Sequence, residues 1–193
     1  MPEAGRVIAG TARGVRLEAA PADTRPLSDR VKQALFASLE SEGLLSDGFL
    51  DLFAGIGAAG IEALSRGAGR AVFVEKSTRA AAIIEANLRR TGLGGGRVVR
   101  ADVLKYLASN HPGEAAPFTV AFVDPPYDQP LVAPTLELLG DSDAVWLSDE
   151  SVVVAKHFWR DEPPECVGTL WRHRQKRFGE TMLSFYTRKR GSI

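Results

Sequence analysis

Apolar and polar residues alternate along the chain in a pattern that predicts strands and helices in turn from Gly48 onward. Short apolar runs typical of buried strands lie at 49–53, 70–75, 97–100, 118–124 and 151–156. Helical patterns follow the first four runs, at 58–67, 77–92, 102–110 and 131–139. Because strands that alternate with helices pair in parallel, we expect a doubly wound α/β fold.

The two ends of the chain break this alternation. Residues 6–19 are short β-prone pieces interrupted by glycine, which predict a small hairpin, and residues 24–43 predict a helix with Ser28 as its N-cap. Residues 167–188 predict two antiparallel strands that turn at Phe178-Gly179. We therefore expect a mostly parallel sheet of seven strands that ends in an antiparallel hairpin.

The chain divides into a hairpin-and-helix extension, residues 1–43, and one compact domain, residues 44–193. Its 193 residues are 45% hydrophobic, which suffices for one globular core. The N-terminus lacks the layout of a secretory signal, no run of eighteen apolar residues could span a membrane, and Cys166 has no second cysteine to pair with. We expect a cytoplasmic monomer.

Glycines and acids gather where the first three predicted strands end. Asp51, Gly55 and Gly57 belong to the run DLFAGIG at the end of the first strand, Glu75 ends the second, and Asp102 follows the third. The carboxyl ends of parallel strands meet at the edge where open α/β sheets bind ligands. Glycines allow close approach of the backbone, and strand-end acids suit ribose hydroxyls and an adenine edge. The pattern predicts a nucleoside site.

Two kinds of nucleoside site fit these glycines. Residues 55–60, GIGAAG, match the GxGxxG of dinucleotide-binding proteins, so this motif alone leaves a NAD site open. The fourth strand, however, ends in Asp124-Pro125-Pro126-Tyr127. Two prolines make a rigid turn with exposed carbonyls, which together with the carboxylate can accept both hydrogens of an exocyclic amine. A flipped base can stack on Tyr127, whereas a dehydrogenase has no use for such a loop.

The sequence resembles the class I S-adenosylmethionine-dependent methyltransferases that carry an (Asp/Asn)-Pro-Pro-(Tyr/Phe) motif and act on amino groups. Within this group it is most similar to the bacterial 16S ribosomal RNA guanine-N2 methyltransferases of the RsmD type. The matching segments are RVIAGTARGVRL, RPLSDRVKQALFASL, FLDLFAGIGAAGIEALSRGA, FVEKS, FVDPPY and KRFGETMLSFY. Ile56, in place of a small polar residue, and Phe178-Gly179-Glu180 depart from the family pattern.

The resemblance implies transfer of a methyl group from S-adenosylmethionine to guanine N2, and a role for each site residue. Asp124 and the carbonyl of Pro125, held by Pro126, orient the amine, and Tyr127 stacks on the base. The cofactor-binding residues are Asp51, Phe53, Ala54, Gly55, Gly57, Glu75, Lys76, Asp102 and Val103. The chemistry requires no metal, and His111, His157 and His173 lie too far apart in the sequence to suggest a metal site.

Basic residues concentrate at the two ends of the chain, although 24 Lys and Arg balance 24 Asp and Glu overall. A neutral sum argues against non-specific binding of nucleic acid, so phosphate contacts should come from local clusters. The candidates are Arg25, Arg30, Lys32, Arg172, Arg174, Lys176 and Arg177. Two-residue spacing predicts that Arg172 and Arg174 share one face of a strand. For any single residue, a solvated side chain is an equally good interpretation.

Two other functions remain as alternatives. A DNA adenine-N6 methyltransferase uses the same loop but would normally carry a target-recognition domain, for which 193 residues leave little room. A nucleotide-binding scaffold that has lost catalysis conflicts with the intact Asp124 and Tyr127. One base pocket and a neutral charge are poorly suited to select one guanine in naked RNA. We therefore expect 16S ribosomal RNA within an assembled or partly assembled small ribosomal subunit as the substrate.

Overall fold

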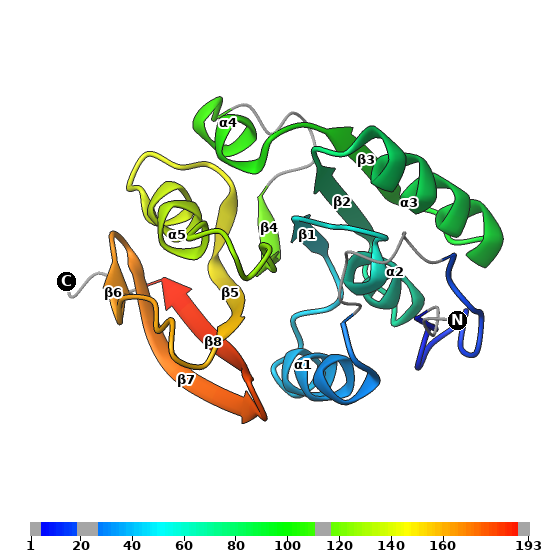
Figure 1. Ribbon diagram of the computed structural model, residues 1–193, viewed down its shortest axis with the longest axis horizontal. Helices are drawn as coiled ribbons and strands as arrows, with labels where there is room; N and C mark the ends of the chain where they lie inside the picture. The colour runs from blue at the N-terminus through cyan, green and yellow to red at the C-terminus, as the bar shows by residue number, and fades with distance from the viewer. Residues whose placement is uncertain (1–4, 19–26, 111–116, 189–193) are drawn as a thin grey trace.

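The computed structural model describes residues 5–18, 27–110 and 117–188, which form an eight-stranded sheet with helices on both faces (Figure 1). The strands are β1 (Gly48–Leu52), β2 (Arg70–Glu75), β3 (Gly96–Arg100), β4 (Phe118–Val123), β5 (Leu147–Phe158), β6 (Cys166–Val167), β7 (Leu170–Phe178) and β8 (Thr181–Arg188). The helices are α1 (Asp29–Ser41), α2 (Ala58–Ser65), α3 (Thr78–Thr91), α4 (Val103–Ala108) and α5 (Val132–Gly140).

The strand order across the sheet is β3-β2-β1-β4-β5-β8-β7-β6. Strands β1 to β5 pair in parallel, and β8, β7 and β6 continue the sheet in antiparallel fashion. This arrangement confirms the doubly wound α/β fold with a C-terminal antiparallel hairpin. The sheet has one strand more than expected because Cys166 and Val167 pair with Trp171 and Leu170, and a two-residue strand is too short for a pattern to reveal.

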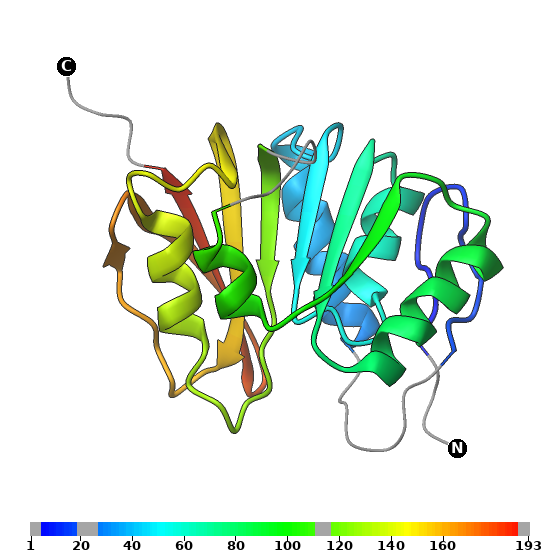
Figure 2. The same cartoon turned by 90° about the horizontal axis from the view of Figure 1, so that it is seen from above.

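Helices lie on both faces of the sheet (Figure 2). Side chains of α1, α2 and α3 share one apolar cluster with one face of the strands, and those of α4 and α5 share a second cluster with the other face. Both faces of the central strands are therefore covered, which explains why all five residues of β1 are buried, with Asp51 as the one polar residue among them.

Residues 5–18 and helix α1 pack on the same face of the sheet as α2. Ser28 caps α1, as expected, because its side chain accepts a hydrogen bond from the N–H of Val31. Residues 5–18 fold back on themselves as a small hairpin, as expected, with an antiparallel bridge between Arg6 and Arg16 and main-chain hydrogen bonds from Val7 to Val15 and from Leu17 to Gly5. Three of its side chains, Val7, Ala12 and Leu17, are buried in the core cluster that includes α2.

The C-terminal hairpin turns at Gly179, whose φ of 61° lies in the left-handed region that glycine tolerates, and this confirms the predicted turn. The expectation that Arg172 and Arg174 share one face is wrong. A register shift lies between them, so that Arg172 pairs with Tyr186 and Arg174 with the adjacent residue, Phe185. Tyr186 and Phe185 belong to the clusters on opposite faces of the sheet, and the two arginines therefore point to opposite sides.

Candidate active site

The predicted site residues lie along the carboxyl edge of the parallel strands. Val74, Leu52, Val123 and Ala155 stand side by side at the ends of β2, β1, β4 and β5. The sheet register thus brings the turn after β1, the end of β2 and the loop after β4 to one edge, as the sequence predicted. It also places there the end of β5, which the sequence analysis did not include.

The turn after β1 has an unusual backbone. Phe53, a non-glycine residue, has a φ of 62°, and Gly55 and Gly57 follow with φ values of 57° and 79°. Left-handed conformations at a residue such as Phe53 are strained by about 1–3 kcal/mol and concentrate at ligand-binding sites. A Cβ on Gly55 would meet nothing within 4 Å, so the turn is open beside this residue. Gly60 serves packing instead, because a Cβ there would lie 2.3 Å from the ring of Phe73.

Asp51 lies beneath this turn and only 2% of it is exposed. Its carboxylate accepts a hydrogen bond of 2.8 Å from the N–H of Gly60 in α2. Burial raises the pKa of Asp51 well above its ordinary value; the Gly60 hydrogen bond opposes this shift, and repulsion from Asp124 and Glu75 adds to it. Asp51 therefore anchors the glycine turn to α2 from within the protein.

Glu75 is the acid that faces the glycine turn. One carboxylate oxygen accepts the N–H of Gly55 at 2.9 Å, and the other accepts the N–H of Ser77 at 2.8 Å. Two main-chain donors thus fix the orientation of the carboxylate while each oxygen keeps a further lone pair. The carboxylate can therefore accept further hydrogen bonds, for example from a pair of hydroxyl groups.

The remaining candidate cofactor residues divide between exposed and buried positions. Asp102 caps α4 by accepting the N–H of Lys105 at 3.1 Å, and it remains exposed, as does Lys76. Val103 is 3% exposed and packs in the core, so that only its main chain can reach a ligand. Ala54 and Ile56 are each 8% exposed. The side chain of Ile56 belongs to the core cluster, which explains why an apolar residue is accepted there.

The loop after β4 holds Asp124 and Tyr127 in defined places. The carbonyl of Pro126 accepts the N–H of Gln129 at 3.1 Å within the turn, and the N–H of Asp124 donates to the carbonyl of Leu52 at the end of β1. The hydroxyl of Tyr127 lies 3.1 Å from Oγ1 of Thr181 at the start of β8. Tyr127 is 36% exposed, so that part of its ring is open to a ligand.

Lys156, in β5, was missed by the sequence analysis. Its Nζ donates to Oδ1 of Asp124 at 2.5 Å and lies 4.6 Å from the centroid of the Tyr127 ring. Burial raises the pKa of the Asp124 carboxyl and the adjacent ammonium opposes that rise, while Asp124 holds the pKa of Lys156 above its ordinary value against the effect of burial. The only sequence signal was a lysine at the end of a buried strand.

One predicted phosphate contact, Lys32, is wrong, and three other candidates have partners within the protein. Lys32 is 0% exposed and donates to the carbonyl of Arg6, so it cannot bind phosphate without unfolding of its surroundings. Arg172 pairs with Glu162, and Arg174 pairs with Glu42. Lys176 donates to Oγ of Ser38. Arg30 and Arg177 are exposed, and Arg25 lies outside the described residues.

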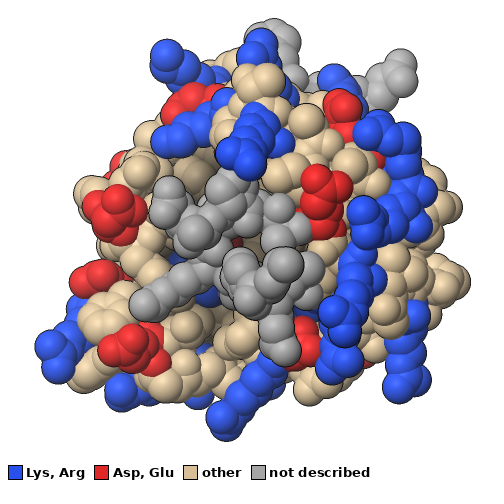
Figure 3. Space-filling model, turned by 45° about the vertical axis from the view of Figure 1, so that its right-hand side comes forward, with Lys and Arg blue, Asp and Glu red and all other residues tan. Residues whose placement is uncertain are grey.

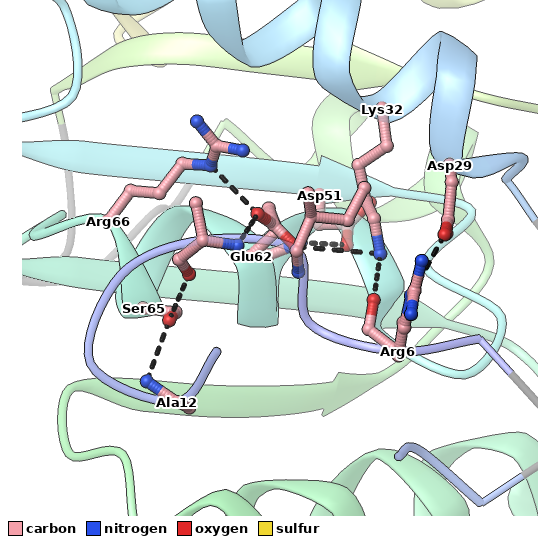
Figure 4. Close-up of polar contacts among 11 residues, drawn as sticks. Arg6, Ala12, Asp29, Lys32, Asp51, Glu62, Ser65 and Arg66 are labelled. Atoms are coloured by element: carbon pink, nitrogen blue, oxygen red, sulfur yellow. Dashed lines mark hydrogen bonds and ion pairs between the residues drawn. The ribbon is translucent and has the colours of Figure 1, made fainter. Parts of the chain in front are cut away.

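A buried polar network fixes the N-terminal segment to α2 (Figure 4). Glu62, 0% exposed, accepts the N–H groups of Ile8 and Ala9 at 2.8 and 3.0 Å. The same carboxylate pairs with Lys32 at 3.5 Å and with Arg66 at 2.8 Å. Because Glu62 and Gly60 lie on the same helix, the network supports the element to which Asp51 anchors the glycine turn.

Within residues 5–18, 27–110 and 117–188, no group of three or more His, Cys, Asp or Glu side chains comes together in a way that could hold a metal ion. In the same part of the chain, no helix has the length and apolarity needed to cross a membrane.

Comparisons with known proteins show which family the chain resembles over nearly its whole length. A family described as Conserved hypothetical protein 95 matches residues 5–187. The Escherichia coli (strain K12) protein named Ribosomal RNA small subunit methyltransferase D is 32% identical over 185 residues, 95% of this chain and 90% of that protein. YlbH of Bacillus subtilis (strain 168) is 36% identical over 190 residues, 96% of this chain and 100% of its own.

Solved structures extend the similarity to the fold. The structure of yhhF from Escherichia coli superimposes with a TM-score of 0.82 at 31% identity, and the match covers 96% of this chain and 98% of that one. A hypothetical protein of Thermus thermophilus gives a TM-score of 0.80 at 37% identity, with coverage of 94% and 98%.

Proposed function

The chain belongs to the RsmD family of methyltransferases, and on that premise we propose that it methylates N2 of a guanine in 16S ribosomal RNA. The observation that carries this proposal is the position of Asp124, whose N–H donates to the carbonyl of Leu52 at the end of β1, so that its carboxylate lies at the same edge as the open glycine turn. Relatives named Ribosomal RNA small subunit methyltransferase D support ribosomal RNA as the substrate. By the same resemblance, the target would be the guanine numbered G966.

The residues along the edge fit S-adenosylmethionine. Gly55 offers space where a side chain would stand, and Glu75 is held by two main-chain donors with lone pairs free for the ribose. Exposed Asp102 and the main chain of Val103, in the first turn of α4, would receive the adenine, because N–H groups in a first helical turn have no partner within the helix. Phe53 and Ala54, in the strained turn, and Lys76, after Glu75, complete the proposed cofactor site.

The cofactor supplies a methyl group already activated by a positively charged sulfur. The part of the protein is therefore to hold the amine in line with that methyl group. Asp124 and the Pro125 carbonyl would accept the two N–H bonds of the guanine amine, so that the nitrogen lone pair forms the new N–C bond while the C–S bond breaks and its electron pair remains on sulfur. The amine then loses one proton to water. Tyr127 supports the base by stacking.

Exposed cations beside this pocket are the best candidates for phosphate contacts. Trp159 and Arg160 follow β5, and the N–H of Trp159 donates to the carbonyl of Glu180, next to the residue that contacts Tyr127. The guanidinium groups of Arg160 and Arg177 lie 4.8 and 4.0 Å from the ring of Trp159. We propose this group, with Arg30 over Phe178 at the same turn, as the RNA-contacting surface.

A second basic region lies farther away. Figure 3, which brings the α3 side of the molecule forward, shows Lys and Arg side chains gathered in a band on one side of this face. Five arginines of α3 and β3 are exposed: Arg79, Arg89, Arg90, Arg97 and Arg100. Strand β3 is three strands away from β4, which is about 14 Å at the usual strand spacing. This band is therefore a suitable comparison surface for tests of RNA binding.

The small basic surface around Trp159 also favours one of the two possible substrates, naked RNA or an assembled subunit. With 24 basic and 24 acidic residues, the protein has little general attraction for naked RNA. We propose that a monomer acts in the cytoplasm on an assembled or partly assembled small subunit, in which the folded particle presents the target guanine.

Substrate class can be tested with methyl-labelled S-adenosylmethionine and three acceptors at one salt concentration: small subunits, protein-free 16S RNA and duplex DNA. We expect transfer to be fastest with subunits, slower with RNA and absent with DNA. Equal rates on subunits and free RNA would contradict the proposed substrate form, and transfer to adenine in duplex DNA would favour the DNA adenine-N6 alternative.

A further inference from the structure

Lys156 lies against Asp124, the residue proposed to hold the target amine. It follows Ala155, which pairs with Val123, so that β5 carries the lysine to the same level as Asp124 on the neighbouring strand. The side chain of Lys156 is 10% exposed and that of Asp124 is 20% exposed. An ion pair so poorly solvated is costly to form, which distinguishes it from the solvated surface pairs common in proteins.

The ammonium of Lys156 is held from two sides. It donates to Oδ1 of Asp124, and it lies over the ring of Tyr127, whose hydroxyl is itself fixed by Thr181. Thr181, Tyr127, Lys156 and Asp124 therefore form a continuous chain of contacts from β8 to the loop after β4. The Oδ2 atom of Asp124 remains available for an N–H group of a ligand, whereas Oδ1 is engaged by the lysine.

We propose that Lys156 is a positioning residue for methyl transfer, which keeps Asp124 ionised and turned toward the target amine before the base enters. This inference rests on the proposed function, but the ion pair between Lys156 and Asp124 can be tested without substrate. A protonated carboxyl would present a donor hydrogen to the amine and lose part of its capacity as an acceptor, so the ionised form is required.

The charged groups around Asp124 explain why a cation is needed. The negative charge of Asp124 raises the pKa of the buried Asp51 on β1, and Glu75 on β2 acts on Asp51 in the same direction, so that three acids share this edge of the sheet. Burial also raises the pKa of Asp124. Among the groups that act on Asp124, Lys156 on β5 favours the charged form, through attraction and a hydrogen bond. Tyr127, on the same loop as Asp124, contacts the lysine.

The first experiment measures the titration of Asp124 directly. In cofactor-free protein labelled with ¹³C at the aspartate carboxyl carbons, the resonance missing from Asp124→Asn belongs to Asp124. Lys156→Met should raise its titration midpoint by about one pH unit or more, the usual effect of a cation within hydrogen-bonding distance. Lys156→Arg should keep most of the wild-type value, and Lys105→Met, which removes an exposed lysine of α4, should leave it unchanged.

Lys156→Gln provides a second test should the methionine variant not fold, because glutamine keeps a polar contact but carries no charge. The titration midpoint of Asp124 should rise in this variant too. An unchanged midpoint in Lys156→Met or Lys156→Gln would overturn the proposal. A shift in Lys156→Arg as large as that in Lys156→Met would also overturn it, since the packing of lysine rather than its charge would then be responsible.

The second experiment connects the pair to the reaction. In Lys156→Met, the acid limb of the pH profile of kcat/KM should move to higher pH by the same amount, so that the rate falls about tenfold at pH values below the midpoint. Affinity for S-adenosylmethionine, measured by calorimetry, should stay at the wild-type value. If the midpoint of Asp124 shifted but the acid limb of kcat/KM did not, the proposed role of Lys156 in methyl transfer would be contradicted. The ion pair between Lys156 and Asp124 would still be established by the first experiment.

Discussion

Removal of the Glu62 carboxylate of α2 is expected to destabilise the protein strongly, because this group holds residues 5–18 and α1 against α2. Glu62 and Lys32 have 0% exposed side chains, and that of Arg66 is 8% exposed. In Glu62→Ala, the N–H groups of Ile8 and Ala9 lose their acceptor, and Lys32 keeps only the carbonyl of Arg6.

The expected magnitude follows from these contacts. Breaking a buried ion pair by removing one partner destabilises a protein by about 3–5 kcal/mol, and each main-chain donor left without a partner adds about 1 kcal/mol at a partly buried site. The terms do not add fully, because residues 5–18 can move away from α2 and regain water. We therefore expect a loss of about 4 kcal/mol from a total that is typically about 5–15 kcal/mol for a domain.

Urea denaturation of the wild type, Glu62→Ala and the matched control Glu85→Ala measures this loss. Glu85 is an exposed residue of α3, so its replacement should change the free energy of unfolding by no more than about 0.5 kcal/mol. In a Lys32→Met background, Glu62→Ala should cost about 1–3 kcal/mol less, because no buried ammonium is then left unpaired. A loss below about 1 kcal/mol for Glu62→Ala alone would refute the reasoning.

The pH dependence offers a further check on the same network. Burial lowers the pKa of Lys32 below its ordinary value of 10.5, and Glu62 opposes this shift. Between the lowered value and 10.5 the unfolded chain binds more protons than the folded chain, so that stability rises with pH in this window. Since loss of Glu62 depresses the pKa of Lys32 further, the deficit of Glu62→Ala should shrink as the pH rises from neutral toward 10.5.

Three further predictions concern the active site. Glu75→Gln should weaken binding of S-adenosylmethionine by about 1.5–3 kcal/mol in calorimetry, because a charge-assisted hydrogen bond to ribose is lost; unchanged affinity would contradict the assigned position. Tyr127→Ala should lose stacking worth about 1–3 kcal/mol in kcat/KM, whereas Tyr127→Phe should retain most activity, and equal loss in both would mean that the hydroxyl rather than the ring is essential. Arg177→Ala should slow methylation of small subunits without changing cofactor affinity, whereas Arg89→Ala on α3 should have little effect, and the reverse result would move the RNA to the α3 side.

Much of the fold was predictable because each element has a strong local signal. Each of the five parallel strands has a β-prone segment bounded by turn residues, and Ser28 and Gly179 mark a helix start and a turn in the expected way. The register of the hairpin was not predictable. The bulge between Arg172 and Arg174 arises from pairing with β8, and nothing in the two-residue spacing reveals it.

The site shows the same division between local and long-range information. The glycine turn, Glu75 and Asp124 follow strand ends in the sequence, so parallel pairing alone brings them together. Lys156 could not be found in this way, because its meaning depends on the register between β4 and β5. Lys32 was misinterpreted for a similar reason: its buried partner Glu62 lies 30 residues farther along the chain, on another helix.

The central claim is that this edge of the sheet transfers a methyl group to the exocyclic amine of guanine. The most direct measurement is mass spectrometry of the nucleosides released from 16S RNA after reaction of unmethylated small subunits with the protein and methyl-labelled S-adenosylmethionine. The account predicts the label in N2-methylguanosine with the wild-type protein, and no label with Asp124→Ala, which should still bind the cofactor. Label in another nucleoside, or N2-methylguanosine formed as fast by Asp124→Ala, would contradict it.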